Sequence, residues 1–150
     1  MNYREIKLSF LMDAEKGTTT RCLIVRVLDD GRTFGIQVAP EMAAAIEALN
    51  DVDKRDGSVL AMFVRALRVA QTNPIAAVLG QEGTTRGWCA TIFFERGSEI
   101  VTGTFPAGFG VVLAGISGAP AYMSEYMYVL LDLAERMPGQ QVGNGALGMN

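Results

Sequence analysis

The sequence predicts an α+β fold with two similar halves, each made of three strands followed by two helices (β-β-β-α-α). In both halves, segments with alternating apolar residues precede segments with helical apolar spacing, which favours a mixed or antiparallel sheet packed with helices. Residues typical of turns and helix starts also recur at a constant offset of 66: Gly17 and Gly83, Thr18 and Thr84, Thr19 and Thr85, Gly31 and Gly97, and Pro40 and Pro106. This constant offset indicates an internal duplication.

The size and composition are those of one folded domain. The chain has 150 residues, of which 49% are hydrophobic and 19% are charged, so it can bury a large core. We therefore expect a single domain over 1–138, with pseudo-repeats at about 1–72 and 73–138. The Gly-rich end, 139–150, is expected to be a flexible tail.

The strands of the first half follow from period-two patterns and one turn. Apolar residues alternate from Ile6 to Met12, and the segment from Thr19 to Leu28 is rich in β-branched residues. The sequence DDG at Asp29 to Gly31 is a strong hairpin turn and leads into a third strand, Thr33 to Val38. These segments predict one strand followed by a hairpin.

Two helices complete the first half. Pro40 suits the first turn of a helix that runs to about Asn50. After a charged loop at Asp51 to Gly57, Ser58 is a good N-cap for a second helix through about Gln71. This second helix is apolar on nearly every side, which predicts either burial on several sides or a contact between subunits.

The same order of elements then repeats. Three strands are expected, at 74–80, 86–95 and 99–103. Pro106 opens a third helix, and the apolar residues from Tyr126 to Met137 form the stripe of a fourth, which ends at Pro138.

The segment from Ile100 to Ser124 contains no charged residue, so its length alone would suggest a membrane span. Two prolines and five glycines interrupt it and leave a helix of about a dozen residues, roughly 18 Å long. That length is too short to cross a bilayer. We expect a buried helix flanked by strands, and no membrane role.

The composition excludes several kinds of site. The chain has no histidine, and Cys22 and Cys89 form no CxxC pair, which excludes Cys/His zinc sites and catalysis by histidine. The net charge of −3 gives no general electrostatic reason to bind nucleic acid or an anionic membrane. The first residues, MNYREIKLSF, lack the apolar segment of a secretion signal, so we expect a reduced cytoplasmic setting.

Two similar stretches, GTTTR at 17–21 and GTTR at 83–86, are candidates for phosphate binding. Their backbone amides and hydroxyls, together with Arg21 and Arg86, could contact an anion. The alternative is structural, because glycine and threonine also suit the connection between the first two strands of each half. Neither stretch has the spacing of a P-loop.

A second group of basic residues could also meet phosphates. Its members lie close together in the sequence: Lys54, Arg55, Arg65 and Arg68. Arg65 and Arg68 share one face of the second helix. Acidic neighbours in the preceding loop dilute this positive charge, so a solvated helix face is the structural alternative.

The remaining candidates for chemistry are carboxylates, since oxygen ligands would favour Mg or Mn. Three groups fall in predicted turns: Asp13 and Glu15, Asp29 and Asp30, and Asp51, Asp53 and Asp56. Solvated charges are the commoner use of such residues. No cofactor is evident, and Mg or Mn would be expected only for a nuclease.

The run TGTFPAGFGVVLAGISGAPAYMS, Thr102 to Ser124, resembles the bifunctional nuclease family, whose members are credited with cleaving DNA and RNA. Pro106 matches the proline that opens the family's helix, VVLAGIS matches the helix, and Gly118 to Tyr122 matches the closing Gly-Ala-Pro-Ile-Tyr motif. The similarity spans roughly Lys7 to Asp132. It implies a domain of the bifunctional nuclease type.

The polar positions of that family are changed in this chain. Phe105 stands where the family has arginine, Ala107 where it has serine, and Gly108 where it has aspartate. Phe109 stands where the family has alanine, and Gly57 with Ser58 stand where it has a His-Asp pair. The side chains of Phe, Ala and Gly can neither bind metal nor stabilise negative charge. The helix start at Ala107 and Gly108 could still offer backbone N–H groups to an anion.

Three hypotheses follow for the function. The first is a divergent bifunctional-nuclease-like protein that binds nucleic acid or nucleotide phosphate with weak or no cleavage. The second is a non-catalytic oligomeric scaffold or protein-interaction module, and the third is an active metal-dependent nuclease. We expect a homo-oligomer, because the second helix and the stretch PAYMSEYMYVLL are very apolar for a small monomer.

Overall fold

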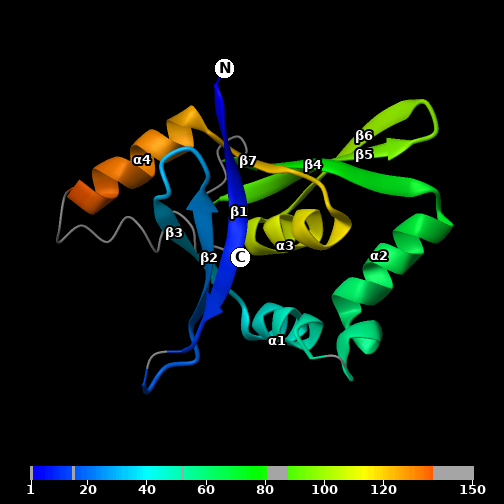
Figure 1. Cartoon of the computed structure of the whole chain (residues 1–150), viewed down its shortest axis with the longest axis horizontal. Coiled ribbons are helices and arrows are strands. Elements are labelled where there is room, and N and C mark those ends of the chain that lie inside the picture. The colour runs from blue at the N-terminus through cyan, green and yellow to red at the C-terminus, as the bar shows by residue number, and fades with distance from the viewer. Residues whose placement is uncertain (1, 15, 52, 81–87, 137–150) are drawn as a thin grey trace.

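The structure is a computed structural model that describes residues 2–14, 16–51, 53–80 and 88–136 (Figure 1). In these residues one sheet of seven strands packs with four α-helices, so the expected α+β class is confirmed. The elements are β1 (Tyr3–Met12), β2 (Arg21–Val27), β3 (Thr33–Val38), α1 (Pro40–Leu49), the 3-10 turn η1 (Arg55–Gly57), α2 (Val59–Val69), β4 (Thr72–Gly80), β5 (Cys89–Arg96), β6 (Glu99–Pro106), α3 (Ala107–Ser117), β7 (Ala121–Ser124) and α4 (Glu125–Arg136). The expected tail at 139–150 lies outside the described residues.

The sheet is built from two antiparallel meanders. Its strand order is β3-β2-β1-β7-β4-β5-β6, with β1, β2 and β3 on one side and β4, β5 and β6 on the other. The short strand β7 joins them, because it pairs antiparallel with β1 and parallel with β4. The sheet is therefore mixed, as the sequence predicted.

The duplicated order of elements recurs in the structure at the predicted offset. Moved along the chain by 66 residues, α1 falls on α3, and α2 falls on α4. The turn residues Gly31 and Gly97 both have positive φ, 74° and 62°. The hydroxyl of Ser58 accepts a hydrogen bond from the N–H of Ala61 at 3.1 Å, and Ser124 accepts one from Met127 at 3.2 Å. Equivalent serines therefore cap equivalent helices.

One element breaks this symmetry and was missed by the sequence analysis. Where the first half has the turn η1, the second half has the strand β7, so its order is β-β-β-α-β-α. The strand has only four residues and follows Pro120, which gives too few positions for a period-two signal. Pairing with β1 and β4, both distant in sequence, decides its conformation.

The helix α3 forms the centre of the core, as expected for a buried helix flanked by strands. A Cβ added at Gly108 would lie 2.6 Å from Val38 on β3, and one at Gly110 would lie 2.1 Å from Ala90 on β5. Five strand steps separate β3 from β5 in the sheet order, a distance of roughly 24 Å in a flat sheet. Because both strands contact the first turn of one helix, the sheet must curl around α3 (Figure 1).

The sequence predicted that the helix α2 is either buried on several sides or in contact with another subunit. It is not buried on several sides. Leu60 is its one buried residue, whereas Val59, Met62 and Val69 are 68%, 50% and 86% exposed. Its partly buried residues Phe63 and Leu67 pack against the core. Of the helices in the described parts of the chain, none is both long and apolar enough to cross a membrane.

Candidate functional site

Arg21 lies in a set of ion pairs at the start of β2. Its guanidinium contacts the carboxylate of Glu47 on α1, lies 3.4 Å from Asp13, and donates to the backbone carbonyl of Met12. Its side chain is only 16% exposed. These contacts compensate its charge and tie α1 to the β1–β2 connection, which favours the structural alternative for GTTTR. The companion residue Arg86 lies outside the described residues.

Lys54 and Arg55 have local partners in the loop between α1 and α2. The ammonium of Lys54 lies 4.0 Å from a carboxylate oxygen of Asp51 in an exposed pair. The Nε of Arg55 donates to the carbonyl of Leu49 at 2.9 Å, where the last turn of α1 leaves carbonyls without helical partners. Both residues therefore fasten the end of α1.

Arg65 and Arg68 project from the exposed side of α2. The helix from Val59 to Val69 contains no acidic residue, so these two arginines give it a positive face. Both residues are exposed, so on this helix face two of the basic residues singled out from the sequence present positive charge to solvent.

The start of α3 is closely packed. Ala107 and Gly108 are both buried, and Gly108 packs against Val38 of β3. The helix has no side-chain cap, and Pro106 is its N-cap residue. The two residues proposed as an anion site thus lie in the core contact between α3 and the curled sheet.

Phenylalanines cluster around the start of α3, where the resemblance noted in the sequence implies an arginine at the position of Phe105. Phe105 stacks on Phe109 with ring centroids 5.2 Å apart, and Phe94 meets Phe105 edge-on at 6.1 Å. Phe63 of α2 completes the cluster by contacting Phe109 at 5.5 Å. Ser58, which stands in the other altered motif, is 6% exposed and caps α2. Both motifs therefore have structural roles here.

The carboxylates singled out from the sequence do not form a metal centre within the described residues, where no group of three or more Asp, Glu or Cys side chains could hold an ion. Asp13 pairs with Arg21, and Asp51 pairs with Lys54 and accepts a hydrogen bond from the N–H of Asp53. Asp29 and Asp30 belong instead to a network of ion pairs.

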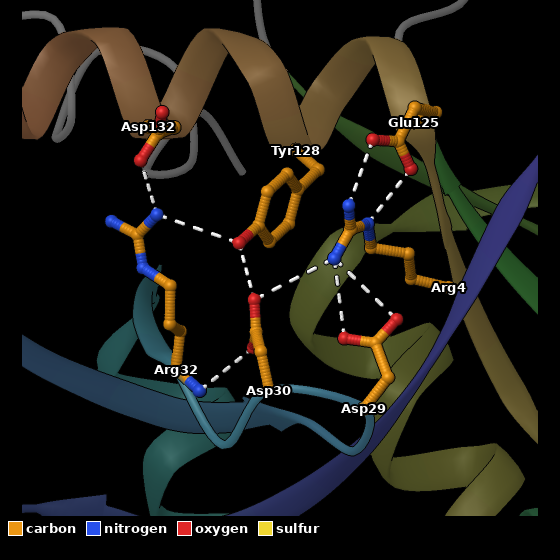
Figure 2. A network of polar contacts seen from close by, with 7 residues as sticks. All are labelled: Arg4, Asp29, Asp30, Arg32, Glu125, Tyr128 and Asp132. Atoms are coloured by element: carbon orange, nitrogen blue, oxygen red, sulfur yellow. Dashed lines mark hydrogen bonds and ion pairs between the residues drawn. The ribbon is translucent and has the colours of Figure 1, made fainter.

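That network joins β1, the β2–β3 turn and α4 (Figure 2). Arg4 of β1 binds both carboxylate oxygens of Glu125, at 2.7 and 2.9 Å, and lies 3.2 Å from Asp29 and 3.5 Å from Asp30. Its guanidinium also lies 3.7 Å from the ring centroid of Tyr128. One arginine thus holds α4 against the turn.

A second arginine extends the network along α4. Arg32 pairs with Asp132, and its guanidinium donates to the hydroxyl of Tyr128 at 3.4 Å. The same hydroxyl donates to Asp30, while Tyr128 packs edge-on against Phe34 of β3. No local sequence pattern indicates these contacts, because the partners are about a hundred residues apart in the chain.

The pairing shifts the ionisation of the network. Hydrogen bonds from Arg4 lower the pKa of Glu125, and hydrogen bonds from Tyr128 and from the backbone N–H of Arg32 lower the pKa of Asp30. Arg32 likewise lowers the pKa of Asp132. The hydrogen bond to Asp30 raises the pKa of Tyr128, because the neutral phenol is the donor. The network is stabilised in the state with charged carboxylates and a neutral tyrosine.

A cleft of about 700 Å³ opens between β1, the end of α1 and the end of α3. Its walls include Leu8 and Phe10 of β1, Leu49 of α1, and Gly115 and Ile116 of α3. Most lining side chains are apolar, but four are polar or charged: Glu5, Lys7, Ser9 and Asn50. Because of this apolar majority and the acidic Glu5, the lining suits a largely apolar group more than a phosphate.

The helix α4 carries an exposed apolar stripe on the side away from the core. Tyr126, Val129 and Leu133 are 66%, 46% and 48% exposed, and their spacing places them on one helical face. Met127 and Leu131 on the other side are buried. The cleft and this stripe are candidate binding surfaces. The stripe lies in the stretch PAYMSEYMYVLL, whose apolar character is visible in the sequence, whereas no sequence pattern indicated the cleft.

Comparison with models of known protein families and with curated proteins gives no match for this chain.

Proposed function

We propose that this protein is a non-catalytic interaction module, the second of the three hypotheses, with the architecture of a bifunctional-nuclease-like domain. The observation that carries the proposal is the cluster of phenylalanines at the altered motif. Phe105 takes a position at which the resemblance implies an arginine, and its ring packs on Phe109, which in turn contacts Phe63. A catalytic site there would need polar side chains.

Physical chemistry explains why this arrangement disfavours cleavage. Phosphodiester hydrolysis requires groups that activate water and stabilise developing negative charge. Packed aromatic rings supply neither kind of group. At the start of α3, Gly108 is buried in a core contact with Val38. The exposed apolar stripe of α4 and the apolar cleft provide binding surfaces instead.

The proposal is tested by incubating the full chain with single- and double-stranded DNA and RNA in Mg²⁺ or Mn²⁺. We expect no cleavage above that of a matched sample with chelator, measured by gel electrophoresis of labelled oligonucleotides. Cleavage that appears with metal and disappears on chelation would overturn the proposal and favour the active nuclease.

A second candidate function, nucleic-acid or nucleotide binding without cleavage, is favoured by the exposed Arg65 and Arg68 on an acid-free helix. Its test is the salt dependence of oligonucleotide binding, measured by fluorescence anisotropy at low salt. Each lost phosphate contact lowers the slope of log K against log salt by about 0.7 to 0.9. The double variant R65A/R68A should therefore flatten the slope, while Arg96→Ala on the β5–β6 turn should leave it unchanged.

A further inference from the structure

The two halves of the fold place their final helices differently. α2 packs against α1, α3 and β4. The duplication exchanges α1 with α3 and β4 with β1, so the equivalent seat for α4 would lie against α3, α1 and β1. In this chain α4 instead follows β7 directly and packs over β3 and the β2–β3 turn, and Figure 1 shows α2 and α4 at opposite ends of the molecule.

The cleft lies at the packing site against α3, α1 and β1 that the duplication predicts for α4; we call this site the seat of α4. Its walls come mainly from β1, α1 and α3, the three elements that the symmetry predicts, and also from Leu28 and the connection between α3 and β7. Gly115 stands in the wall with no heavy atom within 4 Å of its added Cβ, so a neighbouring helix could approach closely there. The lining is mostly apolar, and α4 of the same chain packs elsewhere.

The exposed stripe of α4 has the residue positions that α2 uses for packing. Moved by 66 residues, Leu60, Phe63 and Leu67 of α2 correspond to the stripe: Tyr126, Val129 and Leu133. On α2, Leu60 is 1% exposed, and the other two pack against the core. The corresponding side chains of α4 are all at least 46% exposed. The packing face of α4 is therefore present without its seat.

Two features keep α4 from the cleft of its own chain. The inserted strand β7 carries the chain along the sheet for four residues, roughly 13 Å, before α4 begins. The network of Arg4 with Glu125 and of Arg32 with Asp132 then fastens α4 over the β2–β3 turn. The α4 helix of a second copy is not tethered to this chain in these two ways.

We propose that the stripe of α4 from a second copy of this chain seats in the cleft, so that two copies exchange these contacts about a twofold axis. This inference rests on the proposed interaction role and names its partner. An apolar helix face docking in an apolar groove through residues at i, i+3 and i+7 is a common mode of recognition. A self-complementary pair of surfaces on one chain closes as a dimer.

The test measures dimer dissociation of the full chain by analytical ultracentrifugation. We expect wild-type protein to dimerise, and Val129→Glu on α4 and Gly115→Lys in the cleft each to raise the dissociation constant roughly tenfold or more, since each buries a charge in an apolar contact. Ile100→Glu is the matched control, because Ile100 is a similarly exposed apolar residue on β6, at 55%. It should leave the dissociation constant unchanged.

Mixing the two variants makes the test specific. Val129→Glu and Gly115→Lys should form a heterodimer more tightly than either forms a homodimer, because one contact pairs the two charges and the other is wild-type. Circular dichroism checks that each variant is folded. Any of three results would overturn the proposed exchange of α4 contacts between two copies. These are a monomeric wild-type chain, a dimer that is insensitive to Val129→Glu, and the failure of the two variants to form a heterodimer. Metal-dependent cleavage would overturn the non-catalytic role instead, so the two failures are distinguishable.

Discussion

Gly110 lies in the first turn of α3, where the helix touches β5. A Cβ at this position would lie 2.1 Å from the Cβ of Ala90, far closer than two carbon atoms can approach. Glycine inside a helix is less stable than alanine. It is needed here because no Cβ fits between α3 and β5. Gly110→Ala should destabilise the fold by about 1 to 3 kcal/mol through overpacking, measured by urea denaturation.

Gly115 provides the matched control in the same helix. No atom lies within 4 Å of its added Cβ, so Gly115→Ala should stabilise the protein by roughly 0.5 to 1 kcal/mol through helix propensity. A stabilising effect of Gly110→Ala would contradict the close contact between α3 and β5.

Arg4 is the residue on which acid sensitivity should depend. Hydrogen bonds from Arg4 are the main cause of the lowered pKa of Glu125, and the charge of Arg4 adds to the hydrogen bond from Tyr128 in lowering the pKa of Asp30, so the folded state favours the charged forms of both carboxyls. Their contribution to stability is complete above about pH 4.5 and is lost as the pH falls through the folded-state pKa values. Arg4→Gln should lower stability at pH 6 and reduce the further loss between pH 6 and pH 3.

The measurement is the urea midpoint of both proteins at the two pH values. Arg96→Gln serves as control, because Arg96 forms a 3.5 Å pair with Glu99 in which both side chains are more than half exposed. Exposed pairs of this kind contribute little, so its pH dependence should match the wild type. An Arg4→Gln profile parallel to the wild type would rule out a stabilising role for the network.

At the scale of single elements, α2 and α4 begin in the same way. Ser58 and Ser124 each accept a hydrogen bond from the N–H three residues later, which satisfies one donor left free at a helix start. Ser58→Ala and Ser124→Ala should each cost about 0.5 to 2 kcal/mol, measured by thermal and urea denaturation.

Ser117 is a suitable control for both caps. Its hydroxyl is buried and has no hydrogen-bond partner in the described part of the chain. Removing a hydroxyl that makes no bond avoids its desolvation penalty, so Ser117→Ala should leave stability unchanged or raise it. Equal losses in all three variants would indicate that capping is not the cause.

At the scale of the whole molecule, the duplication explains the fold and also the open cleft. Two meanders meet at β7, and the curled sheet encloses α3. The first half seats its final helix, α2, against the second half. The second half diverts α4 through β7. Among the described residues this leaves the mostly apolar cleft and the apolar face of α4 without each other as partners.

The sequence predicted the elements whose cause is local. The hairpin glycines Gly31 and Gly97, the helix start at Pro40 and the cap at Ser58 act within a few residues, so their patterns can be read along the chain. The basic residues were recognised, but the ion pairing of Arg21 with Glu47 depends on the position of α1 relative to β2. A sequence pattern does not show that distance.

The sequence by itself determined the α+β class and the 66-residue repeat, because these follow from residue type and spacing. Only the tertiary structure decided the strand β7, the curvature of the sheet and the network around Arg4. Each of these depends on contacts between residues far apart in the chain, whose energies are realised only when the whole sheet has formed.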